Sequence, residues 1–356
     1  MATHMVQEEV EKKKVHLGIY PYTYVRTVVM RSLLFKSADY QKMLKMSFSE
    51  IARFLQDSQY KAEIDQLASK YHGAALVEQA LARNMTHMLD KLKRISPGEL
   101  GFLISIYLKR YDVYNIKTLI RAKFTKASEE ALGSLLIPVG NLSRERLKEL
   151  FQKDSVETIV REAKIAPLKH IESALSGFQK EKNLFEIENA LDRAYYTELI
   201  SFLKQLPEEG KLFREFLETE IEVTNVLTVL RLKKENKGKD AIKGQLFHAE
   251  RSILLSSLLD AKDLDEAVAI VEKLFPAAKD AARKYQEQKS LIPVETSLYN
   301  YLLRKSLLLQ HQHPLSVDVI LGYLFAKEME MRNLNVLVKA KQMKMDESFI
   351  EEQLVI

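Results

Sequence analysis

One phrase of sequence occurs three times in this chain of 356 residues. Each copy has an acidic residue, an asparagine three positions later, a run of aliphatic residues, and two basic residues at its end. A second shared motif begins with a glutamate that precedes each asparagine by 37 or 38 residues. Two landmarks that keep one separation in three places indicate an internal repeat. The copies are YDVYNIKTLIRAK (111–123), IEVTNVLTVLRLK (221–233) and MEMRNLNVLVKAK (329–341), preceded by EQALAR (78–83), ENALDR (188–193) and ETSLYN (295–300).

The repeat predicts helices, although its middle copy is rich in Val and Thr. The third copy contains Met, Leu, Glu and Lys, which favour helices, and equivalent positions of a repeat share one structure. Each unit is therefore predicted to open with a helix pair, for the first unit roughly 73–95 and 99–124, broken at Ser96-Pro97-Gly98. The other breaks are predicted at Pro207 and Pro314, because proline suits the first turn of a following helix.

A further shared piece follows the first two pairs and is missing after the third. LKELFQKDSVETIV (147–160) matches LSSLLDAKDLDEAV (255–268), with Ser155 and Asp263 predicted as helix N-caps. The third copy occurs near the N-terminus, in YQKMLKMSFSEIA (40–52), with Ser47 as the cap. We therefore predict an all-α fold of three similar units, closed into a ring or funnel around a pseudo-three-fold axis, with both termini completing one unit. The predicted units are 72–181, 182–291, and 292–356 together with 1–71.

Composition limits the classes of function. The chain has no cysteine, which excludes disulfides, thiolate metal sites and a cysteine nucleophile. Its net charge of +5 comes without a dense cluster of Lys and Arg, which argues against nucleic acid as a partner. No apolar run reaches the ~20 residues of a membrane-spanning helix. The N-terminal MATHMVQEEVEKKK has no apolar core of the kind a signal peptide needs.

Motifs for catalysis and cofactor binding are also missing from the sequence. It contains no phosphate-binding loop, no H-E-x-x-H and no G-x-S-x-G, so we predict no catalytic, cofactor-binding or metal-binding residues. His311 and His313 are expected in a loop between helices and not at a metal, because no acidic pair lies near them. The tyrosines that alternate around Pro21 in YPYTYV suggest an extended segment before a helix that starts near Val25.

The repeated asparagines require an explanation, because a buried amide without a partner costs ~1–3 kcal/mol. We interpret them as structural residues that hydrogen-bond inside the protein, with the acidic residue three positions earlier as a candidate partner on the same helix face. The alternative is a docking triad that faces a partner protein. The repeat-defining structural residues are Glu78, Asn115, Glu188, Asn225, Glu295 and Asn333.

Two basic residues end each copy of the phrase, and two explanations stand side by side. Cations at a helix C-terminus are favoured by ~0.3–1 kcal/mol through the helix dipole. Alternatively, the basic ends form a positive rim that binds an acidic or carbonyl-rich surface of a partner. The candidate partner-binding residues are Arg121, Lys123, Arg231, Lys233, Lys339 and Lys341.

Taken together, the order of these pieces resembles a known family. The opening YPYTYVRTVVMRSLL, the three asparagine-bearing helices and the closing VKAKQMKMDESFIEEQLV are similar to the C subunits of A/V-type ATP synthases, a family related to the d subunit of the eukaryotic V-ATPase. The resemblance covers residues 17–356. Its specificity lies in the combination, since each piece alone is an ordinary helix.

The resemblance implies a non-catalytic central-stalk component of the rotor, with no cofactor. Such a protein is a funnel-shaped socket that joins the central shaft subunits to the membrane rotor (proteolipid) ring, and it transmits torque between ATP turnover and ion translocation. It has no membrane span of its own and lies in the cytoplasm, held at the membrane through the rotor ring. Whether protons or sodium ions are coupled is not implied by this chain.

Two other classes of function remain open from the sequence. One is a free all-helical scaffold that binds a partner peptide or helix in its central cavity. The other is an all-α enzyme, which the lack of clustered Asp and His residues disfavours. Binding to an isolated rotor ring and to shaft subunits would distinguish a coupling protein from a scaffold.

Overall fold

The computed structural model of the protein describes residues 17–133, 135–247, 252–312 and 315–356. All regular structure in these ranges is helical and no strand occurs in them, so the predicted all-α class is confirmed. Three pairs of long helices form the frame of the molecule. They are α6 (Gly73–Arg94) with α7 (Gly98–Thr125), α12 (Phe185–Leu203) with α13 (Lys211–Lys234), and α18 (Ile292–Gln312) with α19 (Val317–Gln342).

These bounds test the helical interpretation of the repeat. The first pair agrees with the predicted 73–95 and 99–124, and the Val-rich copy lies inside α13, so the interpretation is confirmed. His311 belongs to the last turn of α18, and the expectation of a loop at this residue was therefore wrong. His313 and Pro314 lie outside the described residues.

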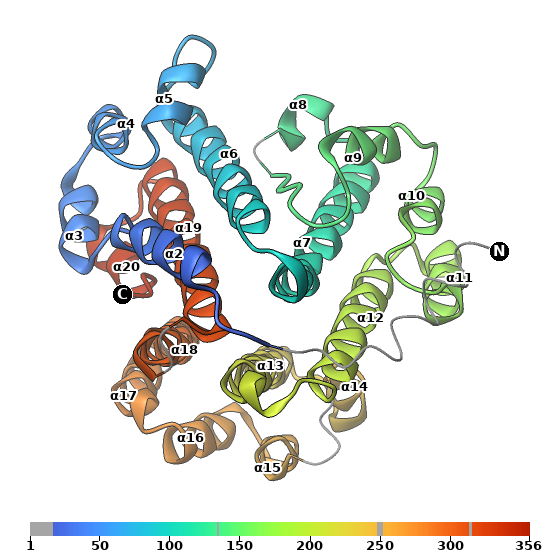
Figure 1. Ribbon diagram of the computed structural model, residues 1–356. Coiled ribbons are helices and arrows are strands. Elements are labelled where there is room, and N and C mark those ends of the chain that lie inside the picture. Colours follow the sequence, from blue (N-terminus) through green and yellow to red (C-terminus); the bar gives the residue numbers. More distant parts are fainter. Residues whose placement is uncertain (1–16, 134, 248–251, 313–314) are drawn as a thin grey trace.

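Helices of successive pairs contact one another around the molecule. Helix α7 packs on α12, α13 packs on α18, and α19 packs on α6. Because α19 belongs to the last pair and α6 to the first, the contacts form a closed cycle and not an open row. In Figure 1 the pairs follow one another around the centre of the view. The pseudo-three-fold symmetry, the funnel shape and the boundaries of the three units stay predictions from the repeat.

Shorter helices lie around the long pairs in Figure 1. Before the first pair come α2 (Pro21–Ser32), α3 (Ser37–Lys45), α4 (Phe48–Gln56) and α5 (Lys61–Leu67). After it come α8 (Glu129–Leu132), α9 (Arg144–Phe151), α10 (Val156–Ala163), η1 (Leu168–His170) and α11 (Glu172–Glu181). The short η2 (Glu208–Gly210) lies between α12 and α13. After the second pair come α14 (Lys239–Lys243), α15 (Ile253–Asp260), α16 (Leu264–Leu274), η4 (Pro276–Ala278) and α17 (Lys279–Gln288), and the last described helix is α20 (Glu347–Glu352).

The start and the end of the described chain share one hydrophobic cluster. Tyr40, Met43 and Ile51 from the N-terminal helices are buried in it together with Leu337 of α19 and Ile350 of α20. A separate, larger cluster runs through all three long pairs and forms the main core. Among the N-terminal helices, α2 packs on α19 and α3 on α20, whereas α4 and α5 pack on α6 of the first pair. The chain start therefore contacts both the last pair and the first, and its completion of the third unit stays a prediction.

Local signals at the helix starts were predicted well, with one exception. The hydroxyl of Ser155 accepts a hydrogen bond from the backbone N–H of Thr158, and Asp263 and Ser47 cap their helices in the same way, so all three N-caps are confirmed. The helix expected near Val25 begins earlier, at Pro21. Proline is pre-organised for the first helical position, and that preference outweighs the extended appearance of the alternating tyrosines.

Candidate functional site

Each repeated asparagine makes the same pair of hydrogen bonds. Its side-chain amide donates to the backbone carbonyl of a residue 22 positions later and accepts from the N–H of that same residue, at 2.6 to 2.9 Å. Both halves of a buried amide are thereby satisfied, as burial requires. The side chain thus fixes an irregular segment against a long helix. The pairs are Asn115 with Ile137, Asn225 with Phe247, and Asn333 with Val355.

The expected bond to the acidic residue three positions earlier is therefore wrong. Asp112 instead accepts from the backbone N–H groups of Asn141 and Leu142, at 2.8 and 3.0 Å, and so holds the same irregular segment as its neighbour Asn115. Burial raises the pKa of Asp112 even though these two donors oppose the shift. A carboxylate and an amide one helical turn apart therefore act together on one stretch of backbone.

The acidic residue of the third copy has a different environment. The carboxylate of Glu330 accepts from the Phe35 N–H at 2.7 Å, from the Tyr60 hydroxyl at 2.7 Å and from the Lys327 ammonium at 2.8 Å. Lys327 is fully buried and also donates to the amide oxygen of Asn84 at 2.9 Å. This charged network joins the N-terminal helices to α6 and α19, which matches the place where the chain ends meet.

The glutamate landmark and the first basic residue of each copy form ion pairs between neighbouring helix pairs. The closest N–O distances are 2.5 Å between α7 and α12, 2.8 Å between α13 and α18, and 2.6 Å between α19 and α6. The three pairs bridge the three contacts that close the cycle of helices. The partners are Arg121 with Glu188, Arg231 with Glu295, and Lys339 with Glu78.

The basic members of these pairs remain accessible. The exposed fractions of the Arg121, Arg231 and Lys339 side chains are 58%, 54% and 56%. The hydrogen bond to Glu188 raises the pKa of Arg121, and the bond to Glu295 does the same for Arg231. Exposed pairs of this kind contribute little to stability, with a median of about 0–1 kcal/mol. Partner binding by these residues stays a prediction.

The second basic residue of each copy caps a short helix. The ammonium of Lys123 donates to the carbonyl of Phe151 at 3.3 Å, at the end of α9. Lys233 donates to the carbonyl of Ala261 just after α15, and Lys341 to that of Leu44 in α3. Carbonyls at a helix C-terminus lack internal partners and attract cations. Each of these lysines therefore binds carbonyls at the end of a neighbouring short helix, while the dipole explanation, which concerned its own helix, stays a prediction.

A charged triad that was not predicted from the sequence joins the second long helix of each pair, α7, α13 and α19. The guanidinium of Arg110 in α7 makes two hydrogen bonds to Glu220 in α13, at 2.7 and 3.0 Å, and lies 3.6 Å from Glu328 in α19. The three residues occupy one register, five positions before the repeated asparagine of each copy. That shared register, with one basic and two acidic residues, is the signal that could have revealed the triad.

Tyrosines complete the surroundings of the triad. The hydroxyls of Tyr107 and Tyr111 donate to the two carboxylate oxygens of Glu328, both at 2.9 Å. The guanidinium of Arg110 lies 3.8 Å from the centre of the Tyr107 ring, a cation–π contact. Burial raises the pKa of Glu328, with Arg110 opposing the shift and Glu220 adding to it. One cation thus serves two carboxylates at the point where three helices meet.

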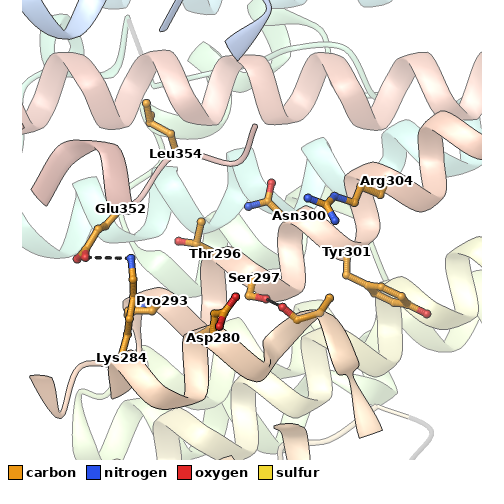
Figure 2. Close-up of a pocket in the computed structure, with 12 residues that line it drawn as sticks. Asp280, Lys284, Pro293, Thr296, Ser297, Asn300, Tyr301, Arg304, Glu352 and Leu354 are labelled. Carbon is orange, nitrogen blue, oxygen red and sulfur yellow. Dashed lines mark hydrogen bonds and ion pairs between the residues drawn. The ribbon is translucent and has the colours of Figure 1, made fainter. Parts of the chain in front are cut away.

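A surface pocket lies between α17, α18 and α20 (Figure 2). Lys284 and Glu352 form an ion pair of 3.3 Å across it, and Arg304 lies on its α18 side. Among the described residues no group of three His, Asp or Glu side chains could hold a metal ion. No described helix is long and apolar enough to cross a membrane. The pocket offers neither a nucleophile with a neighbouring base nor a metal site, and we assign it no chemistry.

A closed cycle of three helix pairs, joined by repeated ion pairs and a central triad, defines a class of all-helical proteins built from an internal repeat. The model of one family, the ATP synthase (C/AC39) subunit, matches residues 24–353. The C subunit of the A-type ATP synthase of Methanococcoides burtonii is 35% identical over 349 residues, 95% of this chain and 94% of the relative. The same subunit of Methanosarcina mazei is 35% identical over 350 residues, which cover 97% of this chain and 95% of the relative. That of Haloferax volcanii is 32% identical over 347 residues, which cover 94% of this chain and 97% of the relative.

The chain therefore belongs to the ATP synthase (C/AC39) subunit family. This is a family of non-catalytic subunits, so the resemblance found in the sequence is confirmed and the protein is not itself an enzyme. ATP synthesis and ion transport are activities of the complex to which such a protein belongs.

Proposed function

We propose that this chain couples rotation in an A-type ATP synthase, as a central-stalk socket between the central shaft and the membrane-embedded rotor ring. The observation that carries the proposal is the closed cycle of helix contacts, in a chain whose relatives of nearly equal length are named as C subunits of A-type ATP synthases. In this role it would lie at the cytoplasmic face of the membrane, held there through the ring.

The contacts between helix pairs suit the transmission of torque. A twisting force on one pair reaches the next through apolar packing and through an ion pair at each of the three junctions. At the centre, Arg110 connects α7 to both α13 and α19 by ion pairs, which opposes independent turning of these three helices. Close-packed interiors transmit strain with little compliance. A closed and cross-connected body therefore resists twisting better than an open row of the same helices.

The proposal is tested by assembling the ATP synthase in lipid vesicles with and without this chain. We expect the complex that lacks the chain to lose ATP-driven ion uptake, while ATP hydrolysis by its catalytic part continues. Adding the purified chain should restore uptake. Equal ion uptake in its presence and absence would refute a coupling role.

The free-scaffold alternative predicts different binding. A scaffold that takes up a peptide would bind neither the isolated rotor ring nor the shaft subunits, whereas a coupling protein binds both. Pull-down of the purified chain with each partner separately therefore distinguishes the two functions. No feature of the described residues favours the scaffold over the coupling protein.

A further inference from the structure

The third copy of the repeat lacks an arginine that the other two copies have. The motif that begins with the glutamate landmark ends in Arg83 and Arg193 in the first two copies, but in Asn300 in the third. Arginine carries a planar, charged guanidinium with five N–H donors, whereas asparagine ends in a short neutral amide. The third copy therefore lacks both a cation and most of the length of a side chain at this position.

The second copy shows what this arginine does. The guanidinium of Arg193 on α12 donates to the backbone carbonyl of Gly244, directly after α14. Gly244 lies 19 positions after the repeated Asn225, and the residue 19 positions after Asn333 is Glu352, the last residue of α20. The arginine of the second copy thus bridges the first long helix of its pair to the end of a short helix that follows the pair.

The corresponding place in the third copy is the pocket between α17, α18 and α20 (Figure 2). Asn300 lines it from α18 and Glu352 from α20, and its volume is about 290 Å³. That is far more space than one water molecule requires. The ammonium of Lys284 reaches Glu352 from α17, at 3.3 Å. A cation from another helix thus partly replaces the missing guanidinium, and the space between α18 and α20 stays open.

Two polar groups of α18 that line this pocket have no partner. The amide oxygen of Asn300 and the hydroxyl oxygen of Thr296 are buried and make no hydrogen bond to any described residue, and Thr296 as a whole is only 7% exposed. In Figure 2 the Thr296 hydroxyl points towards the ion pair of Lys284 and Glu352. Buried polar groups are almost always paired, so two unpaired ones beside a pocket indicate that a guest supplies the donors.

The charges at the pocket can accept a cationic guest at Glu352. Its carboxylate is 28% exposed, and the Lys284 side chain, at 46%, is free to move into solvent when another cation takes its place. Asp280 adds a second carboxylate on the α17 side. Arg304 lines the pocket one turn beyond Asn300, and its charge opposes a cationic guest. Removal of that charge should therefore strengthen binding.

We propose that this pocket binds an arginine side chain of a partner protein, in the place that the side chain of Arg193 occupies in the second copy. The N–H groups of the guest would pair with the oxygens of Asn300 and Thr296 and with the carboxylate of Glu352. A planar guanidinium suits such a site because its donors point in several directions at once. The inference does not depend on the coupling role proposed above.

Isothermal titration of the full chain with a blocked pentapeptide, one arginine flanked by glycines, tests this assignment. We expect saturable binding of one equivalent. The same peptide with citrulline, which is neutral and of nearly the same shape, should bind at least about tenfold more weakly, because hydrogen bonds between a cation and its acceptors are lost.

Variants of the chain locate the site. Asn300→Arg supplies an internal guanidinium, as in the second copy, and should weaken peptide binding at least about tenfold. The matched control is Asn141→Arg, which adds the same charge at an exposed position between α8 and α9 and should bind like the natural chain. Thr296→Val replaces the unpaired hydroxyl by a methyl group and should also weaken binding, whereas Arg304→Gln should strengthen it. Circular dichroism checks that each variant is folded.

Four results would overturn the inference. The first is the absence of saturable binding to the natural chain, and the second is equal binding of the citrulline peptide. The third is unchanged binding by both the Asn300→Arg and the Thr296→Val variants, which would place the peptide elsewhere on the surface. The fourth is binding of free arginine amide as tight as that of the peptide, which would assign the pocket to a small molecule and not to a partner protein.

Discussion

Replacement of Arg110 by methionine is the sharpest test of the contacts that hold the long helices together. Methionine keeps much of the apolar volume of the arginine side chain but removes the cation that serves Glu220 and Glu328. These two carboxylates are only 15% and 13% exposed, against 19% for Arg110, so water cannot replace the cation well. Removal of one partner from a buried ion pair costs ~3–5 kcal/mol. Because the groups keep some contact with solvent, we expect a fall in unfolding free energy of about 3 kcal/mol at pH 7.

The loss of unfolding free energy should depend on pH, and the direction of this dependence follows from the pKa of the carboxyl groups. Burial already holds the pKa of Glu328 above its ordinary value, and loss of the cation would raise it further. A carboxyl whose folded-state pKa is raised stabilises the fold fully below its unfolded pKa of ~4.3, and this contribution is lost as the pH rises through the folded pKa. The variant should therefore approach the natural protein in stability as the pH falls from 7 towards 5.

Urea denaturation followed by far-ultraviolet circular dichroism measures the unfolding free energy of the Arg110→Met variant at each pH, since all regular structure in the described residues is helical. A triple variant, Arg110→Met/Glu220→Gln/Glu328→Gln, removes the charges as well as the cation and should recover most of the lost stability at pH 7. An Arg110→Met variant that loses the same free energy at both pH values would refute the electrostatic reasoning. So would a triple variant as unstable as the single one.

Two further predictions concern the repeated residues. Asn225→Ala should lower the unfolding free energy by about 3 kcal/mol, because it leaves the backbone N–H and C=O of Phe247 unpaired at ~1–3 kcal/mol each. A loss below about 1 kcal/mol in urea denaturation would contradict this expectation. Arg231→Glu should cost less than about 1 kcal/mol through loss of its exposed pair with Glu295, and the swap Arg231→Glu/Glu295→Arg should restore the melting temperature. If the swap restores stability but weakens shaft binding, Arg231 belongs to a partner-binding rim as well; unchanged shaft binding would limit it to the internal pair.

Local features of the fold could be read from the sequence because they depend on neighbouring residues. The serine and aspartate caps and the break between α6 and α7 involve side chains and backbone within a few positions of each other. The repeat added long-range information by indicating that three distant segments share one structure. That the chain start supplies the missing piece of the third unit stays a prediction. The helical class and the long pairs followed from these signals.

The tertiary structure alone decided which distant groups meet. The sequence marked Asn225 as structural, but its partner is the peptide group of Phe247 in an irregular segment, whose path no local pattern specifies. The same holds for Arg110, whose contacts with Glu220 and Glu328 exist only because three helices from different copies converge. Helix periodicity fixes which residues share a face, but the packing of the helices decides what that face meets. The outward valines of α2 show the limit most clearly, since only the folded protein reveals that Val25 and Val29 are exposed while Thr23, Thr27 and Met30 are buried.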